Sequence, residues 1–312
     1  MSVKRQKVSL PSVAEVFESF IKERQAQGIK APTLNNYETS LRVFLRQSDL
    51  DIGSSIACLS KEAVEAYSIA QQEAGVPAST IAHYLRDLRV FIYWAQEQDL
   101  IPSFKIKLPK ITTDTLKRYA ESDLDKLLAT PSKTDPYWVW REWVICNLAI
   151  GTGARISSLC NLKKADIDYK NNCVLFQHTK NGKQLKVPLS QSLKSALNKY
   201  LSVWQIDSDY LLISSQLGAK LEPRVALHSF DKFASLRGVE SQGLHTFRHT
   251  FAFMLYSSGV DIVTIQFLLG HSSIEITRHY IGQLTQANLP EYDNPLDKLM
   301  SSYNRTKAIQ RR

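Results

Sequence analysis

Four short segments, all after residue 150, collect arginine, histidine and tyrosine side chains that suit chemistry on a phosphodiester. They are Gly151–Leu159, Leu244–Thr250, Leu269–Ser273 and Thr277–Tyr280. Attack on a DNA phosphodiester passes through a pentavalent phosphorane with added negative charge, and arginine can present two parallel donors to its non-bridging oxygens. A tyrosine hydroxyl, with an ordinary pKa of about 10, can be the nucleophile if a base lies close by. These residue types are therefore suited to attack on a phosphodiester in which protein cations stabilise the added charge.

In order and spacing, these segments resemble the tyrosine recombinase (phage integrase) family. The resemblance covers about Leu116 to Gly282, and the preceding helices resemble the family's core-binding domain more weakly. It implies six catalytic residues, which are Arg155, Lys180, His245, Arg248, His271 and Tyr280. Two positions depart from the family pattern, since Ser158 replaces a glutamate that supports the first arginine and Phe247 replaces the commoner leucine. Neither change removes a catalytic group.

The resemblance implies a reaction without metal, ATP or any other cofactor. Arg155 and Arg248 clamp the phosphate, and His245 is the candidate base for the hydroxyl of the nucleophile, Tyr280. Lys180, which precedes the Asn-Gly turn of a hairpin, protonates the leaving 5′-oxygen. A covalent 3′-phosphotyrosine at Tyr280 conserves the energy of the broken bond, so that rejoining needs no ATP.

Simpler interpretations exist for several of these side chains. His271, which by resemblance donates to the phosphate, can instead be a mere helix cap after Gly270. His245 and His249 stand four apart on a predicted helix, but the sequence lacks the glutamate of a zinc-protease motif, which disfavours metal binding. His249 alone is typical of a structural residue, and Lys180 alone of an ordinary hairpin lysine.

Other nearby residues offer weaker alternatives. Gly151–Gly153 is similar to part of a nucleotide-binding loop but lacks the lysine of that motif. Tyr292 and Tyr303 compete as nucleophiles only if the spacing from the Leu-Gly-His segment is ignored. Arg278 and His279 are expected to face solvent or DNA rather than take part in the reaction.

Composition agrees with a polyanionic partner. The 312 residues include 39 Lys and Arg against 30 Asp and Glu, which gives a formal net charge of +9. The four cysteines lack paired spacing, which indicates thiols in a reducing compartment rather than disulfides or a zinc ribbon. No apolar run reaches membrane-spanning length, so we expect a cytoplasmic protein without a membrane partner.

Hydrophobic periodicity predicts a mainly α fold with a small β-hairpin or sheet in the catalytic domain. In the first hundred residues, helices are expected over Val13–Arg24, from Thr33 as N-cap, over Lys61–Glu73 and from Ser79. Two β-rich runs flank an Asn-Gly turn, at Cys173–Gln177 and Leu185–Leu189. Further helices are expected at Leu193–Trp204, Val225–Leu236, Thr246–Ser258 and Asp261–Leu269.

These elements predict two domains, and the resemblance implies that the two form a C-shaped clamp around DNA. We expect a helical core-binding, SAM-like domain over residues 8–100 and a lysine-bearing linker over 101–116. The catalytic domain follows over 117–284, and a tail over 285–312 carries apolar residues suited to docking on a neighbouring protomer or on its own domain. The first helix begins near Pro11, which favours a simple recombinase without an arm-binding domain.

The resemblance implies a site-specific recombinase that acts as a homo-tetramer on two double-stranded DNA sites, with room for accessory DNA-bending proteins. Integration or excision of a mobile element is the first interpretation, and Xer-type dimer resolution is the second. A type IB topoisomerase, which would relax supercoils without a defined site, is a less favoured alternative. A binding module without catalysis would be expected to lack some of the six residues, and a metal-dependent nuclease would need clustered carboxylates.

Overall fold

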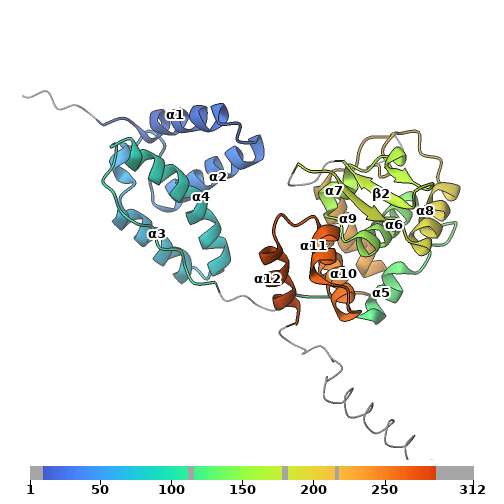
Figure 1. Ribbon diagram of the computed structural model, residues 1–312. Coiled ribbons are helices and arrows are strands. Elements are labelled where there is room, and N and C mark those ends of the chain that lie inside the picture. Colours follow the sequence, from blue (N-terminus) through green and yellow to red (C-terminus); the bar gives the residue numbers. More distant parts are fainter. Residues whose placement is uncertain (1–9, 112–115, 178–181, 215–217, 286–312) are drawn as a thin grey trace, which may run out of the picture. The chain divides into compact units, whose positions relative to one another are not determined.

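A computed structural model of the chain describes residues 10–111, 116–177, 182–214 and 218–285 (Figure 1). The chain divides into two compact units, Met1–Thr113 and Asp114–Arg312. Within the described residues, no helix has both the length and the apolar character needed to cross a membrane.

The first unit is built from α1 Val13–Ala26, α2 Ala31–Gln47, α3 Lys61–Glu73 and α4 Ala78–Glu97, with a 3-10 turn at Ile56–Cys58. Ser12 and Glu15 form a capping box at the start of α1. The prediction that Thr33 caps α2 is wrong, because α2 begins at Ala31 and Pro32 lies in its first turn. Proline fits there since the first backbone N–H groups of a helix have no intrahelical acceptor.

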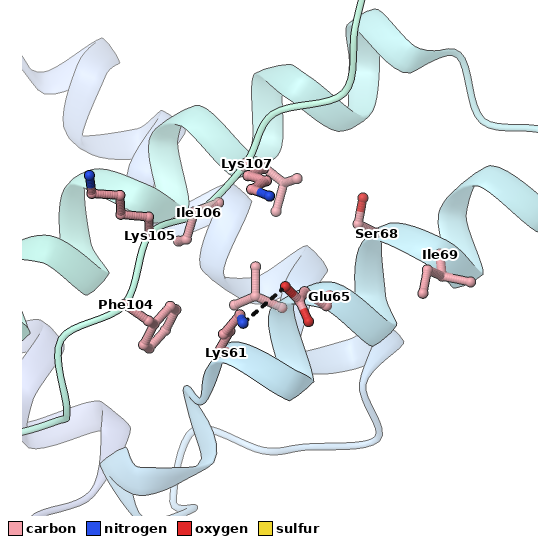
Figure 2. Close-up of a pocket in the computed structure, with 10 residues that line it drawn as sticks. Lys61, Glu65, Ser68, Ile69, Phe104, Lys105, Ile106 and Lys107 are labelled. Atoms are coloured by element: carbon pink, nitrogen blue, oxygen red, sulfur yellow. Dashed lines mark ion pairs between the residues drawn. The ribbon is translucent and has the colours of Figure 1, made fainter.

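The chain that follows α4 packs on this unit instead of leaving it at once. Ile101 and Ile106 are buried in the first unit's core, and the backbone N–H of Ile106 donates to the Tyr93 hydroxyl at 3.1 Å. Figure 2 shows the extended stretch Phe104–Lys107 passing over α3 beside a pocket of about 250 Å³. Half of the segment that the sequence indicates as a linker is therefore held by side-chain burial.

The second unit is mainly helical with one small sheet, as the sequence predicts. Its helices are α5 Glu121–Leu128, α6 Tyr137–Thr152, α7 Ile156–Cys160, α8 Gln191–Val203, α9 Pro223–Leu236, α10 His245–Ser257, α11 Ile262–Leu269 and α12 Ile274–Thr285. Helix α6 packs against α5, α7, α8, α9 and α10, and most of its residues are buried. It forms the centre of the core and ends at the turn that carries Arg155.

The sheet has three antiparallel strands in the order β1-β2-β3. Strands β2 Cys173–Phe176 and β3 Leu185–Pro188 agree with the predicted hairpin, and Val174 pairs with Val187. The sequence did not indicate the short first strand, β1 Ile167–Asp168, which pairs with the outer edge of β2. The start of β3 contacts α11, so the turn end of the β2–β3 pair lies beside the end of that helix.

The loop before α10 is fixed by Tyr119. Its hydroxyl accepts a hydrogen bond from the Gln242 N–H at 3.0 Å and lies 3.3 Å from the Gly243 carbonyl oxygen. Its own N–H donates to Thr250 Oγ1 at 3.0 Å. These contacts hold the start of α10, and with it His245, against the entry to α5.

Candidate active site

A left-handed glycine at the end of α6 directs the chain into Arg155. Gly153 has φ 64° and caps α6, and Arg155 is the N-cap of α7 two residues later. A Cβ at Gly153 would lie 2.3 Å from Phe251 Cδ1 on α10. Only glycine therefore permits this turn and this close approach of α10.

A second glycine turn places His271. Asp261 caps α11 by accepting from the backbone N–H groups of Val263 and Thr264. Gly270, with φ 62°, ends the helix, and the Leu185 side chain of β3 packs against it. His271 thus leaves the end of α11 next to the turn end of the β2–β3 pair.

Arg248 joins these two turns. Its Nη1 donates to the Gly153 carbonyl at 2.8 Å, and its Nη2 donates to the Leu269 carbonyl at 2.7 Å and to His271 Nε2 at 2.9 Å. The side chain is 3% exposed. Burial, followed by repulsion from Arg155, lowers the pKa of Arg248 to about 10, and nearby Tyr280 opposes that shift. The guanidinium therefore stays charged at neutral pH inside a largely dry site.

The Tyr280 hydroxyl lies within this cluster. Its ring makes edge contacts with His249 and His271, at centroid distances of 5.4 and 5.6 Å. The hydroxyl oxygen is buried and makes no hydrogen bond of normal geometry among the described residues. Burial raises the pKa of Tyr280 to about 12, although the nearby Arg248 and Arg155 favour the phenolate. A buried hydroxyl that finds no acceptor in the described part of the chain, close to two cations, is suited to attack on a bound anion.

Two histidines on α10 complete the cluster. Desolvation first, and then the neighbours His249, Arg248 and Arg155, lower the pKa of His245 to about 4. His245 nevertheless counts as an exposed residue, so it is accessible to a substrate. Because it is neutral at pH 7, His245 can accept a proton.

His249 has a larger place in the site than the sequence indicated. Its ring contacts His245 at 4.8 Å and Tyr280 at 5.4 Å, and its Nδ1 lies 3.2 Å from the Lys117 carbonyl. A carbonyl only accepts, so Nδ1 carries the proton and donates. The four-residue spacing of His245 and His249 on one helix face was a usable signal of this contact.

The structure brings five of the six predicted residues together: Arg155, His245, Arg248, His271 and Tyr280. Lys180 lies outside the described residues. Ser158, at the position of the family's supporting glutamate, is buried in α7. Where the chain is described, no three His, Cys, Asp or Glu side chains are grouped as a metal site.

Comparisons with known proteins agree with this arrangement. The model of the Phage integrase family matches residues 117–286. Tyrosine recombinase XerA of Thermococcus onnurineus (strain NA1) is 27% identical over 274 residues, which cover 87% of this chain and 92% of that protein. Tyrosine recombinase XerC of Thermodesulfovibrio yellowstonii (strain ATCC 51303 / DSM 11347 / YP87) is 35% identical over 213 residues, which cover 64% of this chain and 67% of that protein.

A solved structure shares the fold. A lambda integrase tetramer bound to a Holliday junction matches with a TM-score of 0.72 at 19% identity, over 92% of this chain and 81% of that chain. At this identity the likeness shows the fold alone. The family model spans more than half of the chain. The XerA relative, which matches most of the chain's length, is named a tyrosine recombinase. The chain therefore belongs to the phage integrase family and is a tyrosine recombinase.

Proposed function

We propose that Tyr280 cleaves duplex DNA at specific recombination sites and that the same active site rejoins the strands. The observation that carries this proposal is the buried Tyr280 hydroxyl, which has no acceptor among the described residues and lies near Arg155 and Arg248. Two cations beside a nucleophile can stabilise the charge of a phosphorane without a metal ion.

DNA cleavage by Tyr280 is a transesterification. The Tyr280 oxygen forms a bond to phosphorus, and the bond from phosphorus to the 5′-oxygen breaks. The phenolic proton passes to a neutral histidine, with His245 as the first candidate because its pKa is lowered to about 4. Lys180 donates a proton to the leaving 5′-oxygen. Attack by a 5′-hydroxyl from a partner strand reverses these steps and releases Tyr280.

Exposed lysines on the first unit are suited to bind the DNA backbone. Lys105 and Lys107 are exposed on either side of the buried Ile106, so the extended segment presents both to solvent (Figure 2). Lys110 is exposed farther along the same segment. Because Ile106 is fixed in the core, these cations lose less conformational freedom on binding phosphate than lysines on a free linker would.

We extend the proposal to the assembled complex. The core-binding unit and the catalytic unit each bind duplex DNA, and four protomers on two sites exchange strands in the cytoplasm. Accessory DNA-bending proteins are compatible with this assembly. The tail over 285–312, of which only Thr285 lies within the described residues, is proposed to dock on a neighbouring protomer.

Two biological roles fit this chemistry. Integration or excision of a mobile element is the role expected from the sequence. Xer-type dimer resolution gains support from the XerA relative, which matches over 92% of that protein's length. Recovery of the DNA that the protein binds and cleaves in its host separates them, since one role requires element ends and the other a chromosomal site.

A nicked suicide substrate tests the chemistry. Wild-type protein should form a protein–DNA adduct that survives denaturing electrophoresis, and Tyr280→Phe should bind the same DNA without forming it. Supercoil relaxation on plasmids that lack any recombination site would instead indicate a topoisomerase. Adduct formation by Tyr280→Phe at the wild-type rate would contradict the assigned nucleophile.

A further inference from the structure

His271 lies between Arg248, which can only donate hydrogen bonds, and Thr277, whose hydroxyl can donate or accept them. Its Nε2 is 2.9 Å from Arg248 Nη2, and its Nδ1 is 2.9 Å from Thr277 Oγ1. Thr277 is fully buried on α12, three residues before Tyr280. The threonine therefore contacts the histidine from the helix that carries the nucleophile.

The chemistry of these partners fixes the tautomer of His271. A guanidinium has donors only, so Nε2 must be the acceptor of the bond from Arg248. Burial, with Arg248 and Arg155 nearby, lowers the pKa of His271 to about 4, and the ring is neutral at pH 7. A neutral ring carries one proton, which must then be on Nδ1 and be donated to the Thr277 hydroxyl oxygen.

We propose that Thr277 is a positioning residue that holds His271 as the Nδ1–H tautomer, so that Nε2 keeps the Arg248 guanidinium in place before DNA binds. The inference rests on the proposed role of Arg248 in binding the scissile phosphate. Loss of the Thr277 acceptor would leave a buried N–H without a partner, and the ring would gain by moving its proton to Nε2. An Nε2–H group faces Arg248 as a second donor, and the contact between them is then lost.

The donors of Arg248 show what this contact controls. Its Nη2 carries two hydrogens, and these are directed at the Leu269 carbonyl and at His271 Nε2. A fork from Nη1 and Nη2 to two phosphate oxygens needs one Nη2 hydrogen to be released. His271 is the partner that can release this hydrogen, because its side chain can move. The Leu269 carbonyl is instead part of the backbone at the end of α11. Once released from Arg248, Nε2 can take up a proton and donate it to the bound phosphate, the role that the resemblance implies, while Nδ1–H stays on Thr277.

Thr277 also couples this arrangement to the nucleophile. Three residues separate it from Tyr280, which is close to one turn of α12. Docking of α12 on α10 and α11 therefore brings the Tyr280 hydroxyl and the acceptor for His271 into the site together. Undocking of α12 would remove the Tyr280 hydroxyl and the Thr277 acceptor from the site at the same time.

Nitrogen NMR of the full-length protein labelled with 15N-histidine tests the tautomer directly. In the wild type, His271, identified as the signal missing from His271→Gln, should show a protonated Nδ1 and an unprotonated Nε2 at pH 7. Thr277→Ser keeps the hydroxyl and should keep this pattern, whereas the isosteric Thr277→Val should shift it toward Nε2–H. A wild-type spectrum that shows His271 in the Nε2–H form would by itself overturn the proposal.

Cleavage of the suicide substrate supplies the second measurement. Thr277→Val should slow adduct formation by about 10- to 100-fold, the range found when a partner that orients a metal-bound histidine is removed. Thr277→Ser should lie near the wild type, and so should Thr285→Val, a control on α12 whose hydroxyl, among the described residues, bonds within its own helix. Equal defects of the serine and valine variants, with unchanged tautomers, would reduce Thr277 to a packing role.

The two measurements also separate this inference from the proposed function. If Tyr280 were not the nucleophile, Tyr280→Phe would still form the adduct. The tautomer of His271 would remain measurable in that case. If only the inference is wrong, wild-type protein forms the Tyr280 adduct and Thr277→Val forms it at the same rate.

Discussion

Arg248 on α10 donates a hydrogen bond of 2.8 Å to the carbonyl oxygen of Gly153, which ends α6 ninety-five residues earlier in the chain. The bond fixes the turn that presents Arg155, so one proposed phosphate ligand orders the backbone that carries the other. The same guanidinium also donates to the carbonyl at the end of α11. The stability of the fold and the geometry of the site therefore depend on the same buried cation.

Gly153→Ala should destabilise the protein and impair cleavage. A non-glycine residue in the left-handed region costs about 1–2 kcal/mol, and a methyl group forced into a packed core costs about 1–3 kcal/mol more. The free energy of unfolding should thus fall by about 2–5 kcal/mol, as measured by urea denaturation. The added Cβ would meet Phe251 at 2.3 Å, so α10 must shift and the Arg248 contact must lengthen.

Gly182→Ala is the matched control for that variant. Gly182 has φ 72°, but a Cβ there meets nothing within 4 Å among the described atoms. It should lose only the conformational contribution, about 1–2 kcal/mol. Equal losses of unfolding free energy in the two variants would show that contact with Phe251 does not constrain Gly153.

Cleavage should depend little on pH between about 5 and 8. A base with a lowered pKa is active above that pKa and is lost as the pH falls through it. Since the pKa of His245 is lowered to about 4, the ring stays unprotonated over this range. Single-turnover rates of adduct formation, measured across the range, check this expectation.

His245→Ala should change the shape of that profile. Without the base, the phenolate must form by loss of a proton to solvent, and burial raises the pKa of Tyr280 to about 12. The rate should then rise about tenfold for each pH unit. His228→Gln, an exposed histidine on α9, should retain the wild-type profile. A wild-type rate that falls as the pH drops from about 7.5 to about 6, through the ordinary histidine pKa, would contradict the lowered value.

Much of the site was predictable because its positions depend on local turns. The glycines at 153 and 270 follow helical segments directly, and such residues end helices in the left-handed conformation. The spacing from those turns to Arg155 and His271 is fixed by the chain itself. Residue types in sequence order therefore indicated the cluster that the structure brings together.

Other features depend on packing that no local pattern reveals. Helix α6 is apolar on nearly all sides, so it lacks the stripe by which an amphipathic helix is found in a sequence. Strand β1 is two residues long. The contact between Thr277 and His271 forms only when α12 docks. From the sequence alone, a threonine that becomes buried cannot be told from one that stays exposed.

Lys180→Ala should separate acid catalysis from phosphate binding. A substrate with a 5′-bridging sulfur has a leaving thiolate of much lower pKa, which needs little protonation. The variant should be slower by about 10²- to 10⁴-fold on normal DNA and largely restored on the sulfur substrate. Arg155→Ala is the control, and it should not be restored, because its charge acts on the non-bridging oxygens. Equal Lys180→Ala defects on both substrates would mean that the lysine only positions DNA.

The most direct test of the account is to locate the covalent link. Wild-type protein is trapped on a suicide substrate, the DNA is digested, and the modified peptide is sequenced by mass spectrometry. Of the 13 tyrosines in the chain, only Tyr280 should carry the phosphonucleotide, in a peptide that includes Gly282. A link at Tyr292, at Tyr303 or at a residue other than tyrosine would contradict the assignment of the nucleophile.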